Sequence, residues 1–84
     1  MNKIALIKKL KENNISDRYF CLNGGLPYDK ICLEKNEDKW EVYYSEGKAK
    51  IGLMQFDNES EACQCMKEEV STVMELIYGL KIVS

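Results

Sequence analysis

The fold is decided by residues 19–56, which read YFCLNGGLPYDKICLEKNEDKWEVYYSEGKAKIGLMQF. This stretch contains four runs rich in aromatic and β-branched residues, separated by three groups of turn-forming residues. The runs are residues 19–22, 31–34, 40–45 and 49–56, and the turns are residues 23–29, 36–38 and 46–47. Because such short turns join neighbouring strands in antiparallel order, the pattern predicts a four-stranded antiparallel meander.

Alternation along the runs gives each expected strand one apolar face and one mixed face. The apolar sets are Ile31 and Leu33; Trp40, Val42 and Tyr44; and Ala49, Ile51 and Leu53. We therefore expect one face of the sheet to be buried and the other to be at least partly wet, with Tyr43 outside beside Glu41. Gly52 interrupts the last run and is typical of a bulge or of a close backbone approach.

A first helix is predicted from Asn2, as N-cap, to about Lys11, and it stops at residues 13–14. Its apolar stripe is Ile4, Ile7 and Leu10, with Leu6 beside them. A second helix is predicted over residues 59–78, because Asn58 and Glu61 form a capping box before it and Gly79 follows it. Its stripe is Ala62, Met66, Val70, Val73, Met74 and Ile77.

These elements predict a single α+β domain over residues 1–84. An N-terminal helix, a four-stranded antiparallel meander and a C-terminal helix follow one another, with both helices on one face of the sheet. The 84 residues carry 12 basic and 14 acidic side chains, for a net charge of −2. This balance argues against nucleic-acid binding, which needs basic side chains to neutralise phosphates. The net charge is most negative after residue 58, with five acidic and two basic side chains, and this part could attract a basic partner.

Neither a signal peptide nor a membrane span is predicted, so we expect a cytoplasmic protein with reduced thiols. The four cysteines are expected to be inert. Cys63 and Cys65 lie two residues apart on a predicted helix, so they point to different faces and share neither a disulfide nor a metal. The sequence has no histidine. We therefore expect no metal, no cofactor and no enzymatic activity.

Several segments resemble small bacterial immunity proteins, which accompany polymorphic or contact-dependent growth-inhibition toxins. The segments are residues 22–27, 32–35, 38–46, 56–57 and 61–63, and the resemblance extends over about residues 15–68. It implies a cytoplasmic protein that binds a cognate toxin domain, often a nuclease, and blocks its active site or substrate surface. It implies no catalytic residues.

The partner-binding residues expected from outward placement are Tyr28, Asp29, Glu34, Glu41 and Tyr43. Exposed tyrosines and carboxylates together suit a cationic partner surface. Two alternatives stay open. The helix–sheet–helix order resembles double-stranded RNA-binding domains, although the last helix begins with acidic residues that would repel phosphate. The apolar tail of Leu80, Ile82 and Val83 could instead join two copies of the chain.

Overall fold

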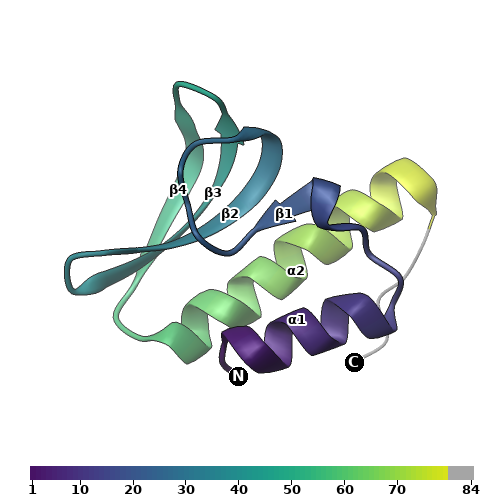
Figure 1. Cartoon of the computed structure of the whole chain (residues 1–84), viewed down its shortest axis with the longest axis horizontal. Coiled ribbons are helices and arrows are strands. Elements are labelled where there is room, and N and C mark those ends of the chain that lie inside the picture. Colours follow the sequence, from purple (N-terminus) through teal and green to yellow (C-terminus); the bar gives the residue numbers. More distant parts are fainter. Residues whose placement is uncertain (80–84) are drawn as a thin grey trace.

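The computed structural model describes residues 1–79, except the side chains of residues 77 and 78. The predicted apolar tail from Leu80 onward and the predicted burial of Ile77 lie outside this description. The elements are α1 (Lys3–Glu12), η1 (Asp17–Tyr19), β1 (Phe20–Cys21), β2 (Tyr28–Asn36), β3 (Lys39–Glu46), β4 (Lys50–Phe56) and α2 (Glu59–Tyr78). The strands form one sheet in the order β1-β2-β3-β4 (Figure 1).

Both helices begin and end where their capping residues predict. The Asn2 side chain accepts a hydrogen bond from the backbone N–H of Ala5, which closes the start of α1. At the start of α2, the Asn58 side chain accepts from the N–H of Glu61 at 2.9 Å and donates to its carboxylate at 2.7 Å. Asn58 is therefore confirmed as the N-cap, whereas the return bond comes from its side-chain amide and not from its backbone N–H as in a capping box. Gly79 ends α2 in the left-handed conformation, with φ 67°.

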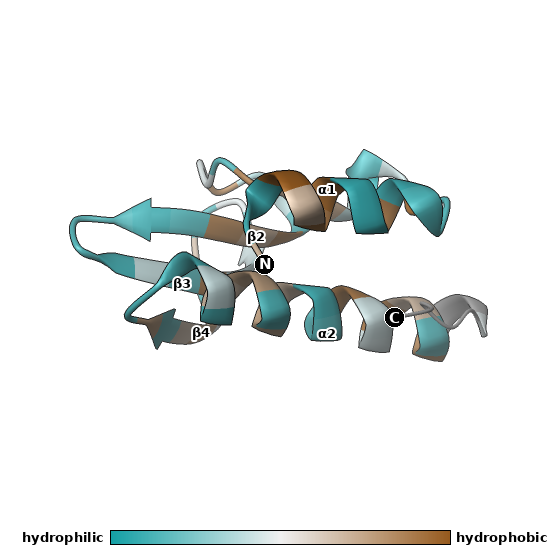
Figure 2. Ribbon diagram, turned by 90° about the horizontal axis from the view of Figure 1, so that it is seen from below, coloured by the Kyte–Doolittle hydropathy of each residue, from teal (hydrophilic) through white to brown (hydrophobic). Residues whose placement is uncertain are grey.

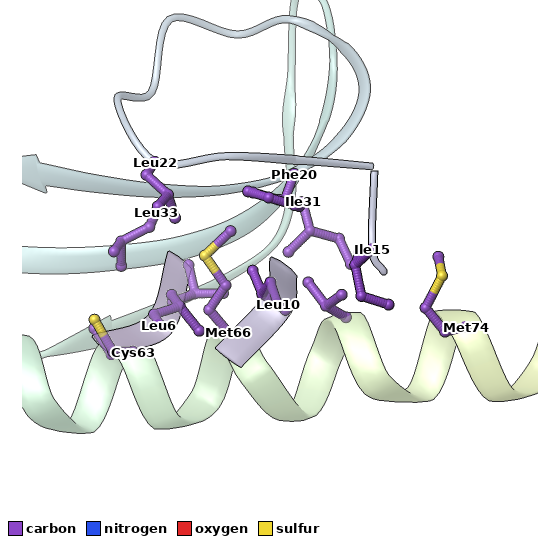
Figure 3. Close-up of a cluster of buried hydrophobic side chains, with 13 residues drawn as sticks. Leu6, Leu10, Ile15, Phe20, Leu22, Ile31, Leu33, Cys63, Met66 and Met74 are labelled. Carbon is purple, nitrogen blue, oxygen red and sulfur yellow. The ribbon is translucent and has the colours of Figure 1, made fainter. Parts of the chain in front are cut away.

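The two helices lie next to each other and contribute to one core. The helix α2 packs against β2, β3 and β4, whereas α1 packs mainly against α2 (Figures 1 and 2). Leu6 and Leu10 of α1 meet Leu33 of the sheet and Met66 of α2 in a cluster of buried side chains (Figure 3). No helix within residues 1–79 has the length and apolar character needed to cross a membrane.

The predicted stripe of α1 is wrong at its first position. Ile4 is 78% exposed, while Leu6 and Leu10 are fully buried and Ile7 is partly buried. Residues four apart lie on the same side of a helix, so Leu6 and Leu10 define the buried side. The buried side faces α2, and Ile4 is left in solvent.

The sheet is mixed rather than wholly antiparallel, which corrects the prediction of a meander. The short strand β1 pairs parallel to β2, with Phe20 opposite Ile31 and Cys21 opposite Cys32. The remaining pairs, β2–β3 and β3–β4, are antiparallel as expected. A parallel pair normally needs a long crossover. Here β1 and β2 pair over only two residues. The loop that connects them has positive φ at Gly24, Gly25 and Leu26.

The inward set predicted for β4 is also wrong, because the strand is bulged. Val42 of β3 pairs with Met54, but Tyr44 pairs with Ile51, so β4 has one extra residue between these pairs. Gly52 has φ 65° and lies in this interval, as its sequence position suggests. The bulge brings Met54 and Phe56 to the core, while Ile51 is 44% and Leu53 43% exposed.

Candidate functional site

The outer face of the sheet, away from the helices, is covered by the loop of residues 22–27. The Ser45 hydroxyl donates a hydrogen bond to the carbonyl of Pro27, and the Cys21 thiol donates to the carbonyl of Gly24 at 3.2 Å. Gly24 itself is buried against the Glu34 side chain. The face that the sequence predicted to be wet is thus partly closed by the chain's own loop.

Beneath this loop lies a polar group that we call the outer-face cluster: Glu34, Glu41, Tyr43, Lys50 and Gln55. Glu34 and Glu41 are direct cross-strand neighbours, a placement in which like charges repel. The Lys50 ammonium lies between them, 2.7 Å from Glu41 and 3.4 Å from Glu34. The Tyr43 hydroxyl donates to Glu34 at 2.6 Å, and the Gln55 amide donates to Glu41 at 3.1 Å. One cation and two neutral donors therefore hold the carboxylates together.

The protonation of the cluster follows from these contacts. The hydrogen bond from Lys50 holds the pKa of Glu41 below its usual value, and the hydrogen bond to Glu41 raises the pKa of Lys50. Burial, with the Glu34 carboxylate beside it, raises the pKa of Tyr43. At neutral pH the cluster therefore contains an ionised Glu41, a charged Lys50 and a neutral phenol. A carboxyl group that donates a proton needs the opposite shift, so Glu41 is poorly suited to general-acid chemistry.

The cysteines occupy protected positions and are all free. Burial raises the pKa of Cys32 to about 11, so its thiol stays protonated at neutral pH. Cys63 is fully buried in the core, whereas Cys65 is half-buried and lies 3.8 Å from the sulfur of Met54. These two side chains occupy different environments, as their spacing predicts. Cys63 and Cys65 pack in or against the hydrophobic core, Cys32 is buried, and Cys21 is half-buried.

The predicted binding residues divide into two groups. Glu34, Glu41 and Tyr43 come together in the outer-face cluster, but Glu41 is only 2% and Tyr43 only 1% exposed. Their expected outward exposure is therefore wrong, since the loop of residues 22–27 and the Lys50 side chain cover that face. Tyr28 is 72% exposed and lies against Gly47 of the β3–β4 hairpin. Asp29 is exposed and accepts a hydrogen bond from the Tyr44 hydroxyl at 2.9 Å.

Gly24 provides a test of how tightly the loop covers the cluster. Its φ is 65°, and a β-carbon added there would lie 2.3 Å from the Glu34 carboxylate oxygen. We expect Gly24→Ala to lower the free energy of unfolding by about 1–2 kcal/mol through the left-handed backbone alone. The crowding should add to this loss. Gly52 has the same φ with nothing within 4 Å of an added β-carbon. Urea unfolding of Gly52→Ala therefore measures the backbone cost, and equal losses in both variants would contradict close packing of the loop.

A second surface lies where the edge of the sheet meets α2. We call it the β4–α2 flank: Ile51, Met54 and Phe56 of β4, and Glu61, Cys65, Glu68 and Glu69 of α2. One hollow, of about 290 Å³, lies among Tyr44, Ile51, Met54 and Glu69. Another, of about 520 Å³, lies among Phe56, Glu61, Gln64 and Glu68. In both hollows an apolar strand surface borders acidic helix side chains.

The acids of the flank are available to a partner. In the described part of the chain, the ion pairs are Lys39–Asp57, Lys50–Glu34 and Lys50–Glu41, so Glu61, Glu68 and Glu69 have no cationic partner there. Among the described residues, their side chains accept hydrogen bonds from neutral amides alone, Glu61 from Asn58 and Glu68 from Gln64. The flank therefore combines unneutralised negative charge with exposed apolar surface.

Parts of the outer-face cluster and of the β4–α2 flank were not predicted, although the sequence contains signals for both. Lys50 and Gln55 join the cluster because the bulge at Gly52 turns Gln55 to the same face as Glu41, and Lys50 reaches across that face. Glu61, Glu68 and Glu69 are spaced by seven and eight residues, which places them on one side of a helix. Comparison with models of known families, with curated proteins and with solved structures finds no match.

Proposed function

We propose that this chain is a cytoplasmic immunity protein that binds and neutralises a cognate bacterial toxin domain. The resemblance of residues 15–68 to immunity proteins of polymorphic and contact-dependent growth-inhibition systems motivates the proposal. The quoted segments form the loop over the outer face, four of the nine residues of β2, the whole of β3, and part of the first turns of α2. They are thus the parts that shape the surface of the sheet.

The single observation that carries the proposal is the β4–α2 flank. Inhibition by stoichiometric binding needs a rigid surface that complements its target in shape and charge. The flank offers two hollows with apolar strand residues and carboxylates that lack cationic partners. A toxin that cleaves nucleic acid needs a cationic substrate surface, because it must bind phosphates. Acidic side chains on a rigid sheet and helix would attract such a surface and cover it.

The five residues that the sequence predicted to bind a partner have different roles in this proposal. Tyr28 and Asp29 are exposed at the hairpin end of the sheet, so they can contact the toxin directly. Glu34 is partly exposed at the edge of the loop. Glu41 and Tyr43 are buried and support the binding surface: Glu41 joins β3 to β4 through Lys50, and Tyr43 joins β3 to β2 through Glu34.

Coexpression with the toxin domain encoded beside this chain tests the function. We expect cells that carry both proteins to survive, and the two proteins to copurify in a one-to-one complex. A catalytically inactive toxin should bind equally well, which separates binding from protection. Coexpression with an unrelated nuclease toxin is the control and should still kill. Death of cells that contain both proteins in soluble form would contradict the proposal.

A further inference from the structure

Within residues 1–79, the strand β4 is an open edge of the sheet. It is the last strand in the order β1-β2-β3-β4, and among these residues it pairs on one side only, with β3. Its seven residues, Lys50–Phe56, leave a row of backbone N–H and C=O groups without sheet partners. The opposite edge, β1, has only two residues and so offers far fewer backbone groups to another strand.

This edge lacks most of the usual protection against pairing. Natural edge strands carry prolines, outward lysines or bulges that discourage another strand. β4 contains no proline, and the ammonium group of its only lysine, Lys50, is bound to Glu41 and Glu34. The bulge at Gly52 is the one protective feature. Beyond it, residues 54–56 pair regularly with β3.

Apolar side chains lie on both sides of the edge. Ile51 is exposed beside the hollow that Glu69 borders, and Leu53 is exposed on the other face of the strand. Leu76 of α2 is 80% exposed and follows Glu69 by seven residues, so it lies on the same side of the helix. A strand added to β4 would place its own side chains beside the apolar side chains of Ile51, Leu53 and Leu76.

We propose that β4 binds its partner by strand addition, and that the added strand is an extended, basic segment of the toxin. The backbone groups of β4 would pair with the segment. Alternate lysine or arginine side chains of the segment would lie over Glu61, Glu68 and Glu69, and the apolar side chains between them would lie on the opposite face, beside Leu53. This inference rests on the proposed function, because it names the surface through which the inhibitor acts.

The charge of the flank selects a basic segment over a second copy of this chain. Pairing two β4 strands about a two-fold axis would bring two α2 helices onto the same side of the joined sheet. The acids Glu61, Glu68 and Glu69 of each copy would then approach those of the other, with no cationic partners among the described residues. Like charges across an interface oppose association, whereas a basic segment neutralises them.

A peptide probe tests strand addition without a toxin. The probe is an acetylated, amidated heptapeptide of sequence KVKVKVK, titrated into the nitrogen-15-labelled chain and followed by NMR. We expect the largest amide shifts in residues 50–56, and binding that weakens as salt is added. Two controls should not bind: the peptide EVEVEVE, and KVKVKVK with alternate N-methylated amides that cannot pair. Shifts centred elsewhere, no shifts in β4, or equal binding of the N-methylated peptide would overturn the proposal.

Matched variants test the charges. Glu68→Lys with Glu69→Lys should weaken binding of KVKVKVK by at least tenfold. Glu12→Lys with Asp17→Lys makes the same change of net charge on exposed residues of α1 and η1, and should weaken it by less than threefold. Equal effects of both pairs would show attraction to net charge alone and would overturn the inference. A chain that is dimeric through β4, by mass measurement and amide exchange, would overturn it as well.

The toxin complex separates this inference from the proposed function. Protection of cells together with slowed hydrogen exchange in β4 supports both. If protection occurs while hydrogen exchange in β4 is unchanged, strand addition fails and the immunity function stands. If no complex forms with the toxin, the immunity function fails, whereas the peptide titration still shows whether β4 accepts a basic strand.

Discussion

Replacing Leu10 with alanine is expected to lower the free energy of unfolding by about 2–5 kcal/mol. Leu10 is fully buried in the cluster that joins α1, α2 and the sheet (Figure 3). Its truncation removes apolar contacts and leaves a cavity that the two helices and the sheet can fill only in part. A domain of this size has a total stability of about 4–13 kcal/mol, so the loss is a large fraction of the whole. Urea unfolding followed by circular dichroism measures it.

Ile4→Ala is the matched control, because it shortens an aliphatic side chain on the same helix. Ile4 is 78% exposed, so we expect a change within about 0.5 kcal/mol. The sequence pattern placed Ile4 and Leu10 on one buried stripe. In the structure Leu10 is buried and Ile4 is exposed, so the two variants test this difference. A loss at Ile4 as large as that at Leu10 would contradict the packing of α1 described above.

The helices were predictable because their signals are local. Asn2, Asn58 and Gly79 satisfy backbone groups within a few residues along the chain, and these contacts form in the structure. The antiparallel pairs β2–β3 and β3–β4 were predictable for the same reason, since short turns join them. Local signals do not fix the buried stripe of α1, because Ile4 and Leu6 are both apolar. Which of them is buried depends on the position of α2.

The parallel pairing of β1 and the bulge of β4 could not be predicted from alternation alone. The direction of β1 depends on how the loop of residues 22–27 folds over the outer face and closes on Ser45. An alternating pattern assigns faces only while the strand is regular, and one extra residue at Gly52 exchanges the faces of the residues beyond it. That exchange moves Leu53 out of the expected core and brings Met54 in.

The candidate binding residues were chosen by face, and the choice of face was right for Glu34, Glu41 and Tyr43. Their burial could not be foreseen, because it arises from the loop above them and from Lys50, which comes from a strand with a bulge. The flank was missed for a related reason. In the sequence, Glu61, Glu68 and Glu69 are typical of an ordinary solvated helix face. Only the structure shows that they lie beside the edge strand β4.

Replacing Lys50 with methionine should be the sharpest test of the outer-face cluster. The change keeps much of the aliphatic stem over Tyr43 but removes the cation between Glu34 and Glu41. Breaking a fully buried pair costs about 3–5 kcal/mol, and Lys50 is partly exposed, so we expect a loss of about 2–3 kcal/mol at pH 7. Adding Glu41→Gln to Lys50→Met should recover at least half of the loss, because the uncompensated buried charge disappears.

The pH dependence of that loss has a definite sign. The pKa of Glu41 is lowered in the folded chain, so its stabilisation is present above the unfolded value of about 4.3 and is lost as pH falls through the folded pKa. The pKa of Lys50 is raised, so its stabilisation is complete below its ordinary pKa. The difference in unfolding free energy between the parent chain and Lys50→Met should therefore be constant from pH 6 to 9 and shrink toward pH 3. A difference that grows on acidification would contradict an ionised Glu41 held by Lys50.

Because the cluster joins β2, β3 and β4, its loss should also loosen the edge strand, and hydrogen exchange in β4 should rise in Lys50→Met more than in Leu10→Ala at equal stability.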